Sequence, residues 1–269
     1  MNAPWIFDQG HYDLLNSSRG SVLRSLLDEL KSSLGLQSAI DVGCGLGHFA
    51  SFLKVLGFDV TAVDGRQQNV DETRRRHSDI RVLQLDAQDP QLPALGKFDL
   101  VLCFGLLYHL ENPMSAIRHL KEMTGKLLLV EAVVYPADEP IMAMIEESPH
   151  EDQGLNHVAF YPTEACLLKM FYRAGFTHAY KFIVQPDHPD YFARRGKPRI
   201  RTMLAASHAP LDSKLLVSTP EPTSPVHPCS LLPRPRATDA AEKIIRFAKK
   251  PLPEKVKVIK RMVSGEVDR

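Results

Sequence analysis

The stretch Ala39-Ile40-Asp41-Val42-Gly43-Cys44-Gly45-Leu46-Gly47 decides the fold of this chain. An apolar run with one acid is followed by three glycines at alternate positions, and a helical pattern begins directly after them. Glycine permits positive φ and a close approach of the backbone to a ligand. The free N–H groups of a first helical turn favour a polar or anionic ligand group. The stretch therefore predicts a buried strand, a tight turn that faces a ligand, and a helix N-terminus.

The spacing of the glycines discriminates between two kinds of nucleotide-binding turn. Dinucleotide-binding turns follow the pattern G-x-G-x-x-G, which requires glycine at position 48, where this chain has His48. The third glycine comes one residue earlier, at Gly47. This G-x-G-x-G turn, preceded by Asp41 and one further residue, resembles motif I of the class I S-adenosylmethionine-dependent methyltransferases. An NAD-dependent oxidoreductase is the alternative that His48 disfavours.

Length and composition fit a globular enzyme without a strong overall field. The chain has 269 residues, 44% of them hydrophobic, and a formal net charge of +1. That charge gives no reason to expect nucleic acid or a membrane as the main partner. The four cysteines lie far apart, without a C-x-x-C pair, which is typical of reduced thiols rather than of disulfides or a zinc site. The sequence shows neither a signal peptide nor a membrane span, so we expect a cytoplasmic protein.

Strands and helices alternate along the chain, which predicts a parallel sheet covered on both faces. We expect strands at about 38–42, 59–63, 80–85, 98–103, 126–133, 176–184 and 200–207. We expect helices at about 47–56, 67–77, 113–123 and 163–174. The fold class is α/β, and the resemblance implies a seven-stranded, doubly wound, mostly parallel, Rossmann-like sheet in the order 3-2-1-4-5-7-6.

Three segments are expected along the chain. Residues 1–36 form an N-terminal helical lid segment, with a helix from Arg19 to Leu34 that ends at Gly35. Residues 37–207 form the methyltransferase domain, in which 135–161 break the alternation as an insertion on the substrate side. Residues 208–269 form a Pro-rich linker and a basic helical tail. The tail is either an arm that binds nucleic acid or a solvated pair of surface helices.

The resemblance implies where the cofactor, S-adenosyl-L-methionine, lies. Four landmarks fall at carboxyl ends of strands, where ligands bind in open α/β sheets. The glycine turn holds the methionine moiety, Asp64 accepts the ribose hydroxyls, and Asp86 meets the adenine amino group. The backbone after the fourth strand lies beside the transferred methyl. The cofactor-binding residues predicted in this way are Asp41, Gly43, Cys44, Gly45, Gly47, Asp64, Gly65, Arg66, Asp86, Ala87, Phe104, Gly105 and Leu106.

His109 is the candidate catalytic residue. It follows the fourth strand, on the stretch that faces the reacting methyl in the resembled family. An imidazole that titrates near neutral pH suits removal of a proton from a hydroxyl or an amine. The alternative is a structural histidine that caps the helix starting at Pro113 or packs on the sheet. An activated sulfonium donor can also react by positioning alone, without a base.

Other polar residues have two readings each. Tyr12 and Arg19 either contact a ligand or lie on a surface helix. Phe160 and Tyr161 either form an apolar wall of the acceptor pocket or staple the helix that follows. A polar group in the insertion either binds a divalent metal or polar substrate groups, or forms a hydrogen-bonded, solvated loop. It matches no known ligand spacing, so we expect no metal there. Its members are His150, Glu151, Asp152, Asn156 and His157.

The predicted activity is methyl transfer to a small or medium-sized acceptor, as O-methylation of a natural product or sugar-like substrate. The segment from Phe98 to Pro113 resembles a branch that contains wobble-uridine tRNA-modifying enzymes and natural-product or sugar O-methyltransferases. A tRNA-modifying enzyme that uses the basic tail, and a non-catalytic module that binds the cofactor, stay open as alternatives. The sequence does not determine the oligomeric state.

Overall fold

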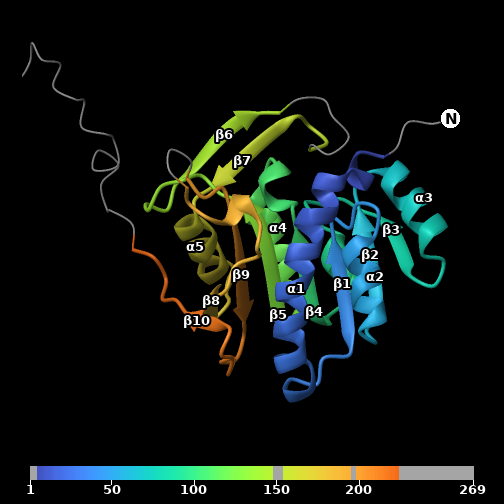
Figure 1. Cartoon of the computed structure of the whole chain (residues 1–269), viewed down its shortest axis with the longest axis horizontal. Helices are drawn as coiled ribbons and strands as arrows, with labels where there is room; N and C mark the ends of the chain where they lie inside the picture. The colour runs from blue at the N-terminus through green and yellow to red at the C-terminus, as the bar shows by residue number, and fades with distance from the viewer. Residues whose placement is uncertain (1–4, 148–153, 195–197, 224–269) are drawn as a thin grey trace, which may run out of the picture. The chain divides into compact units, whose positions relative to one another are not determined.

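A mostly parallel eight-stranded sheet forms the centre of the compact unit Met1–Thr223 (Figure 1). The computed structural model describes residues 5–147, 154–194 and 198–223. The sheet has the order β10-β8-β9-β5-β4-β1-β2-β3. Its strands are β1 (Ser38–Val42), β2 (Asp59–Asp64), β3 (Arg81–Gln84), β4 (Phe98–Phe104), β5 (Thr124–Val133), β8 (His178–Phe182), β9 (Arg201–Ser207) and β10 (Leu216–Ser218).

The predicted strand order is confirmed, and the predicted count is one too low. Strands β1 to β5 pair in parallel, whereas β9 runs antiparallel between β5 and β8. The eighth strand, β10, pairs antiparallel with β8. It lies in the segment that the sequence assigned to the Pro-rich linker from 208, and the contacts of the chain place the boundary after Thr223 instead. The remaining residues of the predicted tail, 224–269, lie outside the described residues.

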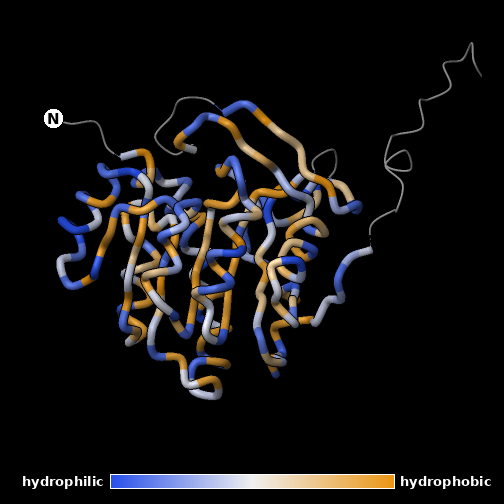
Figure 2. The backbone as a smooth tube through the Cα atoms, turned by 180° about the vertical axis from the view of Figure 1, so that it is seen from behind, coloured by the Kyte–Doolittle hydropathy of each residue, from blue (hydrophilic) through white to orange (hydrophobic). Residues whose placement is uncertain are grey.

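Successive residues of each strand point to opposite faces of the sheet, and both faces are apolar. Ala39 packs on the face covered by α1 (Gly10–Ser33), α2 (His48–Val55) and α3 (Gln67–Arg76). Its neighbour Ile40 packs on the face covered by α4 (Pro113–Met123) and α5 (Glu164–Ala174). Figure 2 shows hydrophobic residues along the strands, in agreement with a sheet that is buried on both sides.

Side-chain caps mark the starts of α4 and α5, whereas α1, α2 and α3 begin without one. The Thr163 hydroxyl accepts from the Cys166 N–H at the start of α5, and Gly175 ends this helix at a φ of 105°. Helix α1 begins at Gly10, well before the predicted start at Arg19. Its first half carries a polar face, so the apolar spacing that predicts a helix is present only in its second half.

The predicted insertion contains two strands that sequence reasoning did not predict. Strands β6 (Met142–Glu146) and β7 (Val158–Pro162) pair antiparallel as a separate sheet. This pair lies above one end of the main sheet in Figure 1, and Tyr161 of β7 packs edge-on against Tyr108. Within the described ranges, every helix is too short or too polar to cross a bilayer.

Candidate functional site

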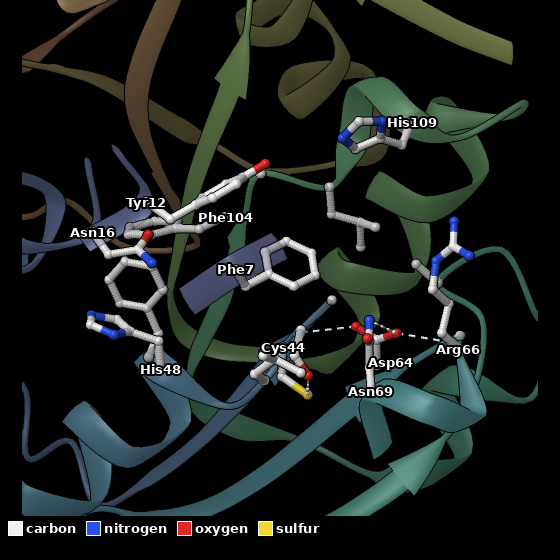
Figure 3. A pocket seen from close by; sticks show the side chains of 18 of the residues that line it. Phe7, Tyr12, Asn16, Cys44, His48, Asp64, Arg66, Asn69, Phe104 and His109 are labelled. Carbon is white, nitrogen blue, oxygen red and sulfur yellow. Dashed lines mark hydrogen bonds between the residues drawn. The ribbon is translucent and has the colours of Figure 1, made fainter. Parts of the chain in front are cut away.

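A cavity of about 610 Å³ opens where β1, β2 and β4 end, and this size is ordinary for a ligand-binding site. Eleven of the thirteen predicted cofactor residues line it, as does His109. Asp41 and Gly47 do not. Figure 3 shows Asp64 and Arg66 on one side of the cavity, and Asn16 and His48 on the other.

The glycine turn has the shape that its sequence predicts. The N–H groups of Gly43 and Cys44 both donate to the Val63 carbonyl, at 2.8 and 3.0 Å, which ties the turn to β2. Gly43 has a φ of 79°, and a Cβ there would lie 2.8 Å from Leu106 Cδ2. This position therefore requires glycine both for its backbone conformation and for the close approach of Leu106.

Gly47 does not line the cavity, and its role is in helix packing. It precedes α2 with a φ of 82°, and a Cβ there would lie 2.6 Å from Thr73 Cγ2. A side chain at this position would collide with α3. We conclude that Gly47 allows two helices to approach each other, and thereby holds the turn in place.

Asp41 lies buried among neighbours of the turn, and its side chain is shielded from the cavity. It is 2% exposed and accepts a hydrogen bond from the Ala50 N–H of α2. Its Oδ2 has no hydrogen-bond partner among the described residues. Burial raises the pKa of Asp41 to about 7, and the nearby Asp64 carboxylate adds to this rise. A direct contact of Asp41 with a bound molecule therefore has no support in this geometry.

Asp64 connects the glycine turn to the start of α3. Its Oδ2 accepts from the Gly45 N–H at 2.9 Å, and its Oδ1 accepts from the Arg66 N–H at 2.9 Å and from Asn69 Nδ2 at 3.1 Å. Burial raises the pKa of this carboxyl, and the three donors oppose the rise. A carboxylate held from three directions on the cavity wall has a fixed orientation toward a ligand. Asn69, which also lines the cavity, was not predicted from the sequence.

The end of the insertion covers the part of the cavity beside Gly65 and Asp86. Arg66 Nη2 donates to the Gly154 carbonyl at 3.3 Å, and a Cβ at Gly65 would lie 2.9 Å from Leu155 Cδ1. Asp86 Oδ1 accepts from the Gln88 N–H at 2.9 Å, which shapes the turn after β3. The predicted residues 65, 66, 86 and 87 are thus brought together under residues 154–156.

His109 lies at the end of a short 3-10 helix, η3 (Leu107–His109), and pairs with an acid from the insertion. Its Nδ1 is 2.6 Å from Glu147 Oε1, and the Glu147 side chain is only 2% exposed. The other oxygen, Glu147 Oε2, accepts from the Gly154 N–H at 2.9 Å. The predicted alternative, that His109 caps the next helix, is wrong because the Asn112 side chain caps α4 instead.

Helix α1 supplies the opposite wall. Tyr12, Asn16 and Arg19 line the cavity, and their spacing places them on one face of the helix. Tyr12 and Arg19 thus face the cavity, and a contact of either with a ligand stays a prediction. Phe160 and Tyr161 do not line the cavity, although Tyr161 supports Tyr108, which does.

Sequence reasoning missed three further residues. Glu131, an acid inside the otherwise apolar strand β5, is fully buried and pairs with Arg19 and Arg201. No local sequence pattern marked Glu147 or Arg201 as site residues. The predicted polar group of the insertion is split: His150, Glu151 and Asp152 lie outside the described residues, and Asn156 lines the cavity. Among described residues, no three His, Cys, Asp or Glu side chains cluster as metal ligands do.

Comparison with known proteins gives the same family from sequence. A family model described as "Methyltransferase domain" matches residues 16–180. A tRNA U34 carboxymethyltransferase of Shewanella sp. (strain W3-18-1) is 30% identical over 156 residues, 54% of this chain and 45% of that protein. A ubiquinone biosynthesis O-methyltransferase of Rickettsia bellii is 29% identical over 113 residues, 40% of this chain and 47% of that protein. The chain thus spans about half the length of these curated relatives.

Solved structures support the fold. The N-terminal domain of EvdMO1, crystallised with SAH, matches with a TM-score of 0.58 at 16% identity, over 71% of this chain and 80% of that one. The magnesium protoporphyrin IX methyltransferase ChlM from Synechocystis PCC 6803, with bound SAM, matches with a TM-score of 0.50 at 17% identity, over 78% and 87%. At such identities the likeness concerns the arrangement of strands and helices.

Proposed function

This chain belongs to the methyltransferase domain family, and from that premise we propose that it transfers the methyl group of S-adenosyl-L-methionine to a small or medium-sized acceptor. The observation that carries the proposal is the cavity itself. The glycine turn, Asp64, Asp86, the backbone after β4 and His109 all line it, and His109 pairs with the buried Glu147 behind it.

The residues present fit the cofactor. Asp64 and Asp86 are fixed carboxylates on the cavity wall, and they suit the hydroxyl and amino donors of a nucleoside. Gly43 packs closely on Leu106, and both residues line the cavity. Asp41 has an indirect role: it accepts a hydrogen bond from the Ala50 N–H and thereby supports the glycine turn. The cofactor would supply a methyl group already activated as a sulfonium.

His109 is the proposed general base, and Glu147 orients it. In O-methylation the acceptor oxygen forms the new bond to carbon, the carbon–sulfur bond breaks with its electron pair going to sulfur, and the hydroxyl proton passes to the imidazole. Because Glu147 Oε1 lies 2.6 Å from Nδ1, the acid fixes the ring and favours the imidazolium that forms. The Gly154 N–H holds the second oxygen of the acid, so the base and the covering residues 154–156 are coupled.

The acceptor is proposed to be a natural-product or sugar-like hydroxyl compound. Support comes from the size of the cavity, about 610 Å³, and from the similarity to a ubiquinone biosynthesis O-methyltransferase. The second candidate is a tRNA-modifying enzyme, favoured by the similarity to tRNA U34 carboxymethyltransferases. An RNA substrate would have to present a flipped base to the cavity and bind elsewhere by its phosphates.

The test is ligand-induced stabilisation followed by methyl transfer. S-adenosyl-L-methionine or its demethylated product should raise the melting temperature, because a ligand at 100 times its Kd adds about 2.7 kcal/mol to stability. NAD should not. Tritiated methyl should then pass from the cofactor to members of a panel of phenols, sugars and bulk tRNA. Stabilisation by NAD alone would refute the proposal, and tight cofactor binding without transfer to any acceptor would indicate a non-catalytic module.

A further inference from the structure

Two buried arginines share one buried carboxylate beside the cavity. Arg19 Nη2 is 2.9 Å from Glu131 Oε2, and Arg201 Nη1 is 3.0 Å from Glu131 Oε1. The side chains of Arg19, Arg201 and Glu131 are 6%, 14% and 0% exposed, respectively. Tyr191 donates its hydroxyl to Glu131 Oε1 at 2.8 Å. The two guanidinium groups therefore have one fully buried counter-charge between them.

The charges are arranged asymmetrically with respect to the cavity. Arg19 and Arg201 line it, whereas Glu131 and Tyr191 do not. Asp190 also faces Arg201, with its Oδ2 3.5 Å from Nε, but this acid is one-third exposed and does not line the cavity. Water screens its charge more than that of a buried group. The wall that a ligand meets at this point is consequently positive.

The two arginines differ in how far their donors are used. Arg19 is engaged on all three nitrogens, by Tyr191 at 3.2 Å, by Asn16 at 3.1 Å and by Glu131. Arg201 hydrogen-bonds Glu131 through Nη1 alone, and its buried Nε has no hydrogen-bond partner among the described residues. A guanidinium carries five N–H donors, so Arg201 retains capacity for a further acceptor.

Arg201 lies next to the proposed base. Its guanidinium carbon is 5.9 Å from the centre of the Tyr108 ring, and the Tyr108 and His109 rings are 4.1 Å apart, centre to centre. All three residues line the cavity. A group bound by Arg201 would therefore be held close to the atom that gives up its proton to His109.

We propose that Arg201 binds a carboxylate of the acceptor, so that the substrates of this protein are hydroxy acids. The proposal rests on the proposed function, whose acceptor site it specifies. Arginine recognises a planar carboxylate by parallel N–H donors. The burial of Arg201 excludes the phosphates of a folded polynucleotide and leaves room for a compact anion. Arg19 and Arg201 share the buried Glu131, and the further acid at Arg201 is partly exposed, so a carboxylate bound here would meet an excess of positive charge.

The experiment measures the preference for acids over matched amides. Hydroxybenzoates, aliphatic hydroxy acids and their carboxamides are titrated into the full chain, both ligand-free and saturated with the demethylated cofactor, by calorimetry. A hydroxyphenyl phosphate distinguishes a carboxylate site from a general oxyanion site. At least one acid should bind tenfold or more tightly than its amide and accept labelled methyl. In R201Q this preference should fall to within twofold, and R201K should retain part of it.

The controls separate the possible failures. R118Q removes an exposed arginine of α4 that does not line the cavity, and it should leave the preference unchanged. The affinity of R201Q for the demethylated cofactor should stay within twofold of wild type, which also shows that the variant is folded.

Equal binding of acids and amides across the panel would refute the proposal. So would a loss of cofactor affinity in R201Q, because the guanidinium would then serve the cofactor. Acid preference without any cofactor binding would instead refute the proposed function and leave the anion site standing.

Discussion

At the scale of single residues, two buried aspartates at the ends of neighbouring strands have different roles. Asp64 receives three N–H donors and presents its carboxylate to the cavity. Asp41 receives one backbone N–H, keeps one oxygen without a partner among the described residues, and is shielded from the cavity. Burial raises the pKa of Asp41 to about 7, because a single N–H donor opposes it and the nearby Asp64 charge adds to it.

This difference predicts a pH dependence of stability that belongs to Asp41. Its pKa is 3.8 in an unfolded chain and about 7 in the fold, so between these values the folded state holds the extra proton. Stability therefore falls as the pH rises from about 4 to 7. Asparagine keeps an acceptor for the Ala50 N–H without the charge. D41N should gain stability over wild type across this range, by up to about 4 kcal/mol above pH 7.

Urea unfolding of D41N and wild type at pH 5, 6, 7 and 8 measures that difference. D59N, which changes an exposed aspartate at the start of β2, is the matched control and should show no pH-dependent difference from wild type. Parallel stability curves for D41N and wild type would show that Asp41 does not titrate in this range.

At the scale of elements, the insertion between β5 and α5 completes the site. It places Glu147 on His109 and residues 154–156 over the cavity. If Glu147 orients the base, E147Q should lower kcat by about tenfold or more, since the general base itself contributes about 10² to 10⁴. The acidic limb of the pH profile of kcat should move to lower pH, because a carboxylate stabilises the neighbouring imidazolium.

E146Q is the control for E147Q, because Glu146 is the adjacent acid and does not line the cavity. Affinity for the demethylated cofactor should be unchanged in both variants. A fall in kcat with an unmoved pH profile would assign Glu147 a purely structural role. H109N should abolish the acidic limb, and full activity of H109N would show that positioning alone supplies the rate.

The elements that the sequence predicted are those whose signals are local. Apolar runs along the chain predicted the five parallel strands, and the family resemblance supplied their order. Helix α1 was predicted too short because Tyr12, Asn16 and Arg19 face a cavity instead of a core, which removes the apolar spacing from that half. Strands β6, β7 and β10 are short and depend on their partners. Glu147 lies 38 residues from His109, so only the folded chain brings them together.

At the scale of the whole chain, the sheet and the cavity lie within the unit that ends at Thr223. The described residues that line the cavity fall between Phe7 and Arg201, and the last strand described, β10, ends at Ser218. A chain shortened after Thr223 therefore keeps the core and the site. It should bind the demethylated cofactor within twofold of the full chain and unfold in one cooperative transition.

The same truncation decides between the two acceptor classes. The segment 224–269 carries many lysines and arginines, so if it holds a tRNA, its removal should weaken tRNA binding and flatten the dependence of log affinity on log salt concentration. A hydroxy-acid acceptor requires only the cavity, and its turnover should survive the truncation. We expect that outcome, because Arg201, His109 and Glu147 all precede the cut and are held by contacts that precede it as well. Loss of methyl transfer to every small acceptor in the shortened chain, with cofactor binding intact, would move the assignment to the tRNA-modifying class.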